Sequence, residues 1–463
     1  MTGGNRKVIG LVLLWIGLVS TIALAGPSYD ISLSVDFDQG TFAGTMRVAY
    51  TAPDRLSDVI FRLLPNGGGI YGDASLEVSD VKVDGRPIDA ELTGGGTTLC
   101  IPLSSPLEPG ETIVVDLSFD GRGARSSEGG ASGYGVLTKG EAAITLAAFY
   151  PLLAPRTEEG WVIHPVPGFG DALVADYAAY HVVVTTETGL GVAATGELID
   201  AAVEDGSTTY RFATGGARDF SIAITDGYEM TEERSGDFTV RTWFTPDDSD
   251  AGRAARRLAI EAVALYEGVI GDLPIREIEL VEVTLHEAAG VESSGLILIS
   301  SEYAEHPEDP FYDVIVSHEV AHQWFYNTVG NDVIDDPWLD EGLVSYLSHV
   351  FLEQTHPGAA GDQLRRWETS YEAASDKYDH LTVASRLFDF PDVSSYTSYV
   401  YSGGALLFDA IRSEIGDSAF FTALSDYYRE NSGEIATPAD LIGAFERASD
   451  RSLDRLFAGF SGN

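Results

Sequence analysis

Residues 318–322 read His-Glu-Val-Ala-His, and this segment constrains the fold of the chain more than any other. It lies in the apolar-periodic stretch 314–325, which predicts a helix. Two histidines four positions apart share one helix face, so both imidazoles can bind the same metal ion. Glu319 flanks that face and is placed to hold a water molecule rather than the metal. The motif therefore predicts a catalytic zinc site with His318 and His322 as ligands.

A zinc site of this kind needs a third protein ligand, and we predict that Glu341 supplies it. Glu341 follows His322 by 19 positions, on a predicted second helix that begins at Asp336-Pro337. Proline is favoured in the first turn of a helix, which supports this start. The intervening residues are enough for the chain to turn back and lay the second helix beside the first. Two histidines and one glutamate leave a fourth position open to water, as catalytic zinc requires.

Two kinds of periodicity divide the chain and predict two domains. Alternating or β-branched runs separated by glycine-rich turns predict strands from about residue 28 to 225, the clearest being 29–35, 78–83, 112–119 and 181–185. From residue 248 onward the pattern is mainly helical, with short strands at 278–284 and 296–300. We therefore predict a multidomain chain, with an all-β sandwich or saddle-shaped domain at 26–235 and an α+β domain at 236–463.

The amino terminus resembles a targeting segment. Arg6 and Lys7 precede the apolar stretch 8–25, which ends in the small-residue pattern Ala23-Leu24-Ala25. This order predicts a secretory signal peptide at 1–25. The apolar stretch is near the lower limit for crossing a bilayer, so an uncleaved single-helix membrane tether is the alternative. Both interpretations predict an exported protein that is extracellular, periplasmic or on the outer face of the membrane.

The acidic composition excludes one class of partner. The chain has 28 Lys+Arg against 72 Asp+Glu, a formal net charge of −44. Such a charge repels phosphate backbones, so we expect no nucleic-acid binding. A carboxylate-rich surface also stays soluble where salt screens its self-repulsion, and the scarcity of lysine fits a salt-adapted source. The single cysteine, Cys100, excludes an intrachain disulfide and a cysteine-based zinc cluster.

Three segments together resemble the M1 metallopeptidases, relatives of aminopeptidase N and leukotriene A4 hydrolase. The first is the zinc motif with Glu341 in the setting Trp-Leu-Asp-Glu-Gly at 338–342. The second, Ala-Gly-Val-Glu-Ser at 289–293, is similar to the family's GxMEN exopeptidase motif. The third, Tyr-Ser-Gly-Gly-Ala at 401–405, is similar to its Tyr-x-Lys-Gly-Ala segment. The chain departs from these motifs at Val291, Ser293 and Gly403.

The resemblance implies a thermolysin-like catalytic domain and a zinc aminopeptidase with one Zn²⁺ per chain. Glu319 and Tyr401 would be the catalytic residues, because Glu319 would carry the proton and Tyr401 would donate a hydrogen bond to the oxyanion. Glu292, with Gly290 in the same segment, would bind the free amino terminus of a peptide substrate. The amino-terminal domain offers no clear match for a second amine-binding group, and Glu141 is the candidate.

Two alternative functions remain open on the sequence alone. A zinc endopeptidase would result if the segment around Val291 and Ser293 left the cleft open at its end. A non-catalytic binding scaffold of the same fold is the other alternative, although ligands, proton carrier and tyrosine are all present. We therefore predict an aminopeptidase acting on peptides with a free amino terminus.

Overall fold

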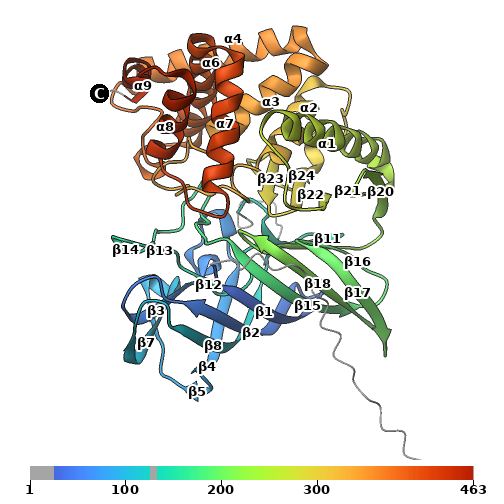
Figure 1. Ribbon diagram of the computed structural model, residues 1–463. Helices are drawn as coiled ribbons and strands as arrows, with labels where there is room; N and C mark the ends of the chain where they lie inside the picture. Colours follow the sequence, from blue (N-terminus) through green and yellow to red (C-terminus); the bar gives the residue numbers. More distant parts are fainter. Residues whose placement is uncertain (1–25, 126–132, 462–463) are drawn as a thin grey trace, which may run out of the picture.

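The computed structural model describes residues 26–125 and 133–461, which form a β-rich half and a mainly helical half (Figure 1). The predicted signal peptide or tether at 1–25 lies outside these residues. Within the two described ranges, no helix combines the length and the apolar character needed to cross a membrane.

A large mixed sheet forms the body of the β-rich half. Its strands lie in the order β17 (Glu197–Glu204), β18 (Ser207–Ala217), β15 (Ala178–Glu187), β1 (Ser28–Asp36), β2 (Thr41–Thr51), β8 (Thr112–Arg122), β4 (Ser75–Val83) and β5 (Arg86–Pro87). Strand β1 alternates strictly between buried and exposed residues, with Tyr29, Ile31 and Leu33 facing the core. Alternation of this kind buries one face of a sheet and leaves the other to solvent.

Smaller sheets complete this half and cover the buried face. One contains β12 (Leu152–Leu153), β3 (Leu56–Arg62), β7 (Thr98–Leu107) and β6 (Glu91–Thr93). Another contains β16 (Gly191–Ala194), β19 (Ile222–Thr225), β11 (Ala143–Leu146), β10 (Leu137–Lys139) and β9 (Ala124–Arg125), and β13 (Arg156–Thr157) pairs with β14 (Gly160–Trp161). Short 3₁₀ turns occur at Leu64–Gly67, Gly69–Tyr71, Gly94–Gly96, Pro246–Asp248, Ser301–Tyr303 and Leu387–Asp389.

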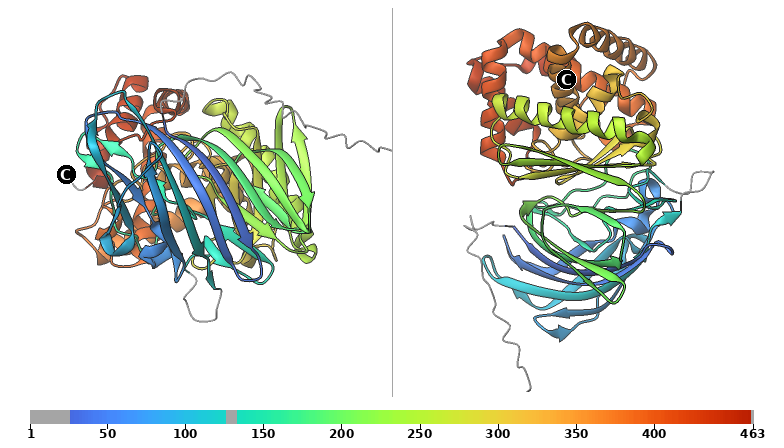
Figure 2. Two further views of the ribbon diagram at one scale, coloured as in Figure 1. Left: turned by 90° about the horizontal axis from the view of Figure 1, so that it is seen from below. Right: turned by 90° about the vertical axis from the view of Figure 1, so that its right-hand side faces the viewer.

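A five-stranded sheet lies between the β-rich half and the helices (Figures 1 and 2). Its order is β20 (Glu229–Ser235), β21 (Phe238–Phe244), β22 (Glu277–Val283), β24 (Leu296–Ser300) and β23 (Gly290–Ser293), so that β23 is an edge strand. The helices are α1 (Ser249–Val269), α2 (Pro310–Ala321), α3 (Glu341–Thr355), α4 (Pro357–Lys377), α5 (Val393–Tyr396), a π-helical segment (Thr397–Gly403), α6 (Gly404–Ile415), α7 (Asp417–Asn431), α8 (Pro438–Ser449) and α9 (Asp454–Ser461).

The helix α2 is capped at its first residue and supported near its second half by a contact with α1. It begins with Pro310 at its first turn, and the Asp309 side chain caps it by accepting from the backbone N–H of Phe311 at 2.9 Å. Its partner α1 supports it through Tyr266, whose hydroxyl donates to the Ser317 carbonyl at 3.0 Å. The chemistry-bearing end of α2 therefore sits on a rigid support.

The predicted fold class, an all-β domain followed by an α+β domain, is confirmed. The predicted start of the second helix at Asp336-Pro337 is wrong, because α3 begins at Glu341. The carboxylate of Asp332 accepts backbone N–H groups of the following residues and holds them in a turn, and Asp340 then caps α3. The division at 235/236 stays a prediction. In the strand pairing β20 already belongs to the five-stranded sheet, so the change of sheet falls at 226–228.

Candidate active site

Helices α2 and α3 lie against each other and bring His318, His322 and Glu341 together. The two Nε2 atoms of the histidines are 3.3 Å apart. Glu341 Oε2 lies 3.2 Å from Nε2 of His318 and 3.5 Å from Nε2 of His322. Tetrahedral ligands at about 2.1 Å from a zinc ion are roughly 3.4 Å from one another. The triangle of donor atoms thus fits a zinc ion, and none of the described residues forms a hydrogen bond with the buried Glu341 Oε2.

Neighbouring groups orient the His322 ring and keep Glu341 ionised, and both effects favour the binding of a cation. The Phe325 carbonyl lies 3.1 Å from Nδ1 of His322, which fixes the ring so that Nε2 faces the triangle. Burial opposes the ionisation of Glu341, but the imidazoles of His318 and His322 beside it outweigh burial and lower the pKa of this carboxyl below its usual range. Glu341 is therefore held as a carboxylate, the form that binds metal.

Glu319 lies beside the triangle, close to the edge strand β23. One of its oxygens, Oε2, is buried and has no hydrogen-bond partner within residues 26–125 and 133–461, so it is available as an acceptor. A Cβ atom at Gly290 would clash with the Glu319 carboxylate as it lies in this structure, so the missing side chain lets β23 approach it closely. The structure thus gives a steric reason for a glycine at position 290, which the sequence motif alone did not provide.

Glu292 extends from the same edge strand toward the metal-binding triangle. Its carboxylate lies within 4.8 Å of donor atoms of Glu319 and His322. Burial raises the pKa of Glu292 to about 8; the charge of His322 opposes this shift, and the carboxylates of Glu341 and Glu319 add to it. A cationic group entering here would favour the ionised form of Glu292 and pair with it, which makes this end of the site suited to an ammonium group.

The hairpin that carries Glu292 is tied to both halves of the molecule. From the catalytic helix side, Gln323 donates to the Ser293 carbonyl at 3.1 Å and accepts from the Gly295 N–H at 2.8 Å. From the β-rich half, the buried Asp219 accepts from the Ser294 N–H at 2.8 Å. The position of Glu292 relative to the histidines is therefore set by hydrogen bonds on both sides.

Tyr401 reaches the site from the π-helical segment 397–403. Its hydroxyl donates to Glu341 Oε1 at 2.5 Å, and its ring stacks on His318 with a centroid distance of 5.9 Å. Burial and the charge of Glu341 raise the pKa of Tyr401 well above its usual range, so the phenol keeps its proton. It can thus serve as a hydrogen-bond donor beside the metal ligands.

These side chains line a cavity of about 530 Å³ between the two halves. The predicted residues Gly290, Glu292, His318, Glu319, Glu341 and Tyr401 line it, and His322 lies behind them. The cavity also receives Asp171 and Tyr134 from the β-rich half. Glu141, the predicted amine-binding candidate of that half, is exposed in the turn between β10 and β11 and is not among the described residues that line the cavity.

Asp171 was missed because it stands in a loop without a motif, between β14 and β15. Burial raises its pKa well above the usual range, and the charges of Glu292 and Glu341 add to this shift. Its only sequence signal is the turn-forming Gly170 before it, whose N–H donates to the hydroxyl of Tyr134 at 2.9 Å. The amino-terminal half therefore contributes a carboxyl group to the site from a different segment than predicted.

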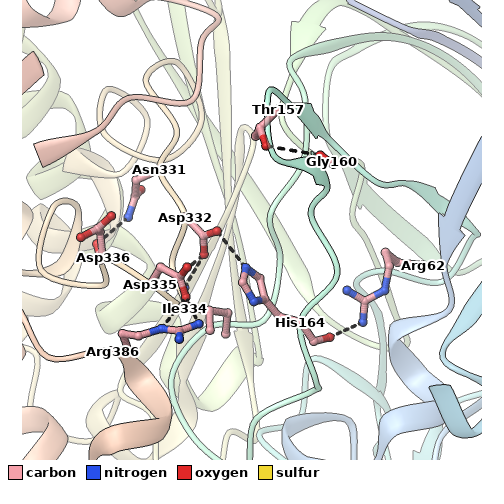
Figure 3. Close-up of polar contacts among 10 residues, drawn as sticks. All are labelled: Arg62, Thr157, Gly160, His164, Asn331, Asp332, Ile334, Asp335, Asp336 and Arg386. Carbon is pink, nitrogen blue, oxygen red and sulfur yellow. Dashed lines mark hydrogen bonds and ion pairs between the residues drawn. The ribbon is translucent and has the colours of Figure 1, made fainter. Parts of the chain in front are cut away.

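The loop that carries Asp171 is fastened to the helical half by the contact between His164 and Asp332 in Figure 3. His164 Nε2 lies 2.8 Å from Asp332 Oδ2, and Arg386 pairs with the neighbouring Asp335 at 2.5 Å. Arg62 of β3 donates to the His164 carbonyl at 2.5 Å and holds the loop from the other side. The donor atoms of this cluster are close enough for a metal ion, but its acids already face a histidine and a guanidinium. We assign it a structural role.

Comparison with known families identifies the part of the chain that contains the site. The Peptidase family M1 domain matches residues 263–460. Among curated relatives, the chain is 22% identical over 460 residues to aminopeptidase 2 of Candida albicans, covering 92% of this chain and 46% of that protein. It is 23% identical to probable aminopeptidase 1 of Saccharolobus solfataricus, covering 83% of this chain and 48% of the relative. The chain thus spans about half the length of these relatives.

Solved structures match the fold over almost the whole chain. The M1 zinc metallopeptidase of Deinococcus radiodurans aligns with a TM-score of 0.66 and 18% identity, covering 94% of each chain. A mutant of that enzyme, solved with a Tyr-Ser-Ala substrate, aligns with a TM-score of 0.65 and 19% identity, again over 94% of each chain. At this identity the match establishes the shared architecture of both halves.

Proposed function

Because residues 263–460 form a peptidase family M1 domain, we propose that this protein is a zinc aminopeptidase that removes amino-terminal residues from peptides. One observation carries the proposal: the His318, His322 and Glu341 triangle faces the same cavity as Glu292 and Tyr401. A metal site, an acidic pocket for an ammonium group and a phenolic donor in one cavity are the parts this reaction needs. The curated relatives named as aminopeptidases support the same class of reaction.

His318, His322 and Glu341 would hold the zinc ion. When bound, zinc supplies Lewis-acid activation of water and of the substrate carbonyl. Glu319 takes the proton from the attacking water on its free acceptor Oε2 and passes it to the leaving amine. Glu319 takes no part in the contacts among His318, His322 and Glu341. Its carboxylate can therefore accept a proton without giving up a bond to the metal.

Tyr401 stabilises the negative charge that develops on the substrate carbonyl oxygen. In the structure its hydroxyl donates to Glu341 Oε1, so the donor already points at the edge of the metal site. A small shift of the hydroxyl lets it donate to the oxyanion instead. A neutral phenol is required for this role, and burial keeps Tyr401 in that state.

Glu292 binds the substrate's amino terminus and thereby places the first peptide bond over the metal site. The tripeptide bound to the Deinococcus enzyme supports a peptide as the substrate class. An endopeptidase, the second candidate, would need the chain of a longer substrate to run past Glu292. The bridging of the Glu292 hairpin by Gln323 and Asp219 favours a closed end at this point.

The proposal is tested by metal analysis together with hydrolysis of an amino-acyl arylamide. Protein stripped with a chelator should be inactive, and one equivalent of zinc should restore arylamide release. Cleavage of internal peptide bonds with no arylamide release would favour the endopeptidase. Stoichiometric zinc with no hydrolysis of either substrate would favour the non-catalytic scaffold.

We also propose that the protein is exported, on the strength of the basic and apolar pattern at 6–25. Amino-terminal sequencing of protein recovered from its source tests this point. A terminus at Gly26 indicates a cleaved signal peptide, and an intact terminus in a membrane fraction indicates a tether. An intact terminus in the cytoplasm contradicts export.

A further inference from the structure

Tyr326 has a backbone conformation that its side chain makes unfavourable. Its φ is 142°, and a positive φ is uncommon for residues other than glycine and an outlier for a bulky side chain. The residue follows His322 by four positions and is buried, with 6% of its surface exposed. Conformations of this kind persist only where the surrounding structure holds them, and they cluster at functional sites. A tyrosine at a position that suits glycine therefore indicates a use for its side chain.

The backbone of Tyr326 is held by hydrogen bonds on both sides. Its N–H donates to the Val329 carbonyl at 2.9 Å, and its carbonyl accepts from Nε of the buried Arg218 at 3.2 Å. The next residue, Asn327, donates its N–H to the His322 carbonyl at 2.9 Å and accepts from the backbone N–H of Arg218 on Oδ1 at 3.3 Å. These bonds stabilise the unfavourable backbone, so the phenol ring has a defined place.

The ring of Tyr326 and the carboxylate of Glu292 flank the same histidine. Tyr326 lines the cavity, and its ring stands nearly perpendicular to that of His322, with the centroids 6.4 Å apart. The carboxylate of Glu292 lies within 4.8 Å of a donor atom of His322. Arg218, which holds the backbone of Tyr326, also donates its N–H to Ser294 Oγ at 3.0 Å in the turn after the strand of Glu292. The two side chains are therefore fixed beside each other through shared partners.

The hydroxyl of Tyr326 is available to a ligand. It forms no hydrogen bond with another residue within 26–125 and 133–461. Of the other tyrosines that line the cavity, Tyr134 accepts a backbone N–H and Tyr401 donates to a proposed metal ligand. Burial raises the pKa of Tyr326 well above its usual range, and the carboxylates of Asp219 and Glu292 add to this shift. The phenol therefore stays neutral, and its oxygen can accept a hydrogen bond.

An ammonium group bound in this cavity needs more than one acceptor. It brings three N–H donors, and buried donors are normally all paired. A second carboxylate beside Glu292 would raise the pKa of Glu292 further and favour its uncharged form. A neutral hydroxyl supplies an acceptor without this effect.

We propose that the hydroxyl of Tyr326 accepts a hydrogen bond from the substrate's amino terminus and, together with Glu292, selects substrates with a free amine. The inference rests on the proposed aminopeptidase function and names a further residue that determines its specificity. The contact comes from the segment that directly follows the metal-binding motif. This role accounts for a tyrosine where the backbone suits glycine.

The test compares leucyl p-nitroanilide with isocaproyl p-nitroanilide, which has the same side chain and leaving group but no amine. Zinc-loaded wild type should strongly favour the amine substrate in kcat/KM. Tyr326→Phe keeps the ring and loses only the hydroxyl, and it should lower this preference by about tenfold, the range for one hydrogen bond to a charged group. The rate with the isocaproyl substrate and the zinc content should stay at their wild-type values.

Two further variants separate amine binding from a structural role. Tyr50→Phe is the matched control, because it also removes a buried hydroxyl that has no partner among the described residues, at a position that is not among those lining the cavity. It should keep the wild-type preference. Tyr326→Gly removes the ring and suits the positive φ, and it should lose at least as much of the preference as Tyr326→Phe.

A preference in Tyr326→Phe equal to that of wild type would overturn the inference, even if Tyr326→Gly is impaired, because the hydroxyl would then play no part in amine binding. Equal hydrolysis of the two substrates by wild type would contradict the aminopeptidase proposal itself, and the inference with it. If wild type hydrolyses neither substrate, calorimetric affinities of leucinamide and isocaproamide for the zinc-loaded proteins decide the role of Tyr326. Tighter binding of the amine that is lost in Tyr326→Phe would sustain the inference, and an unchanged difference would overturn it.

Discussion

In the proposed mechanism, proton transfer and metal binding fall on different side chains of the site. Glu319 neighbours the metal ligands, yet its Oε2 remains an unpartnered buried acceptor while Glu341 makes the contacts to the histidines. Replacing the acceptor by an amide of the same shape should therefore remove the proton carrier alone.

We expect Glu319→Gln to retain one zinc per chain and to lose nearly all turnover, by about a thousandfold or more. Metal content by mass spectrometry and arylamide kinetics measure the two effects on the same sample. Loss of zinc in this variant would identify Glu319 as a ligand and contradict its assigned role.

Some residues of the site could be predicted from the sequence, and others could not. His318, Glu319 and His322 lie within one helical turn, so their juxtaposition follows from helix geometry. Asp171 reaches the cavity only through the folding of a long loop, and no local sequence pattern predicts that it lies there. Glu141 was chosen from the correct half of the molecule but lies on an exposed turn.

At the level of elements, two glycines set how α3 and α6 pack. A Cβ atom at Gly404 would lie 2.7 Å from Gly342 Cα, so the helices touch backbone to backbone. Glu341 precedes one of these glycines, and Tyr401 lies three positions before the other. The contact therefore helps to set the distance between Glu341 and Tyr401, the proposed metal ligand and the proposed phenolic donor.

Gly404→Ala should force these helices apart and destabilise the protein by about 1–3 kcal/mol, the usual cost of overpacking. The control Gly268→Ala adds a methyl group in open space near the end of α1 and should stabilise by about 0.5 kcal/mol. Denaturant unfolding of both variants measures the two changes. Equal stability of Gly404→Ala and wild type would show that the helices do not meet at this point.

Strand β22 contains a buried acid whose ionisation opposes folding. Burial raises the pKa of Glu282 to about 7; the hydrogen bond from Thr245 opposes the shift, and the carboxylate of Asp248 adds to it. The folded state thus binds this proton more tightly than the unfolded chain. The associated stability is complete below the ordinary glutamate pKa and is lost as pH rises through about 7.

We expect Glu282→Gln to exceed wild type in stability by about 1 kcal/mol at pH 8 and to lose this advantage near pH 5. Unfolding free energies measured across this pH range test the expectation. An advantage that does not vary with pH would exclude ionisation of Glu282 as its cause.

Elements with clear periodicity were predictable, and their ends were less so. The alternating run 29–35 became β1, and the run after residue 248 became α1. The start of α3 was misplaced because side-chain hydrogen bonds from Asp332 favour a turn where the proline suggested a helix. Two-residue strands such as β13 carry too little pattern to be recognised.

On the scale of the whole molecule, net charge opposes the compact state, and contacts between residues far apart in sequence hold the two halves together. A formal charge of −44 makes the compact state repel itself. The buried Arg218 nevertheless joins the halves, donating to the carbonyls of Ala175, Thr328 and Glu434. Contacts of this kind link residues far apart in sequence, which is why the cavity between the halves could not be predicted from the chain alone.

The melting temperature should rise when salt increases from 0.01 M to 1 M, because the screening length falls from about 30 Å to about 3 Å. Thermal unfolding in sodium chloride, with sucrose as an uncharged control, separates screening from general solute effects. A melting temperature that does not rise with salt would contradict self-repulsion as a major cost to this protein.

We propose that zinc and Glu292 together restrict cleavage to the first bond of a free amino terminus. The most direct measurement compares product masses and kcat/KM for one peptide with a free and with an acetylated amino terminus. Zinc-loaded wild type should remove only the first residue from the free peptide and leave the acetylated one nearly intact. Glu292→Ala should reduce kcat/KM for the free peptide by roughly 2–4 kcal/mol in transition-state stabilisation. Internal cleavage of the acetylated peptide at the rate of the free one would contradict the aminopeptidase account.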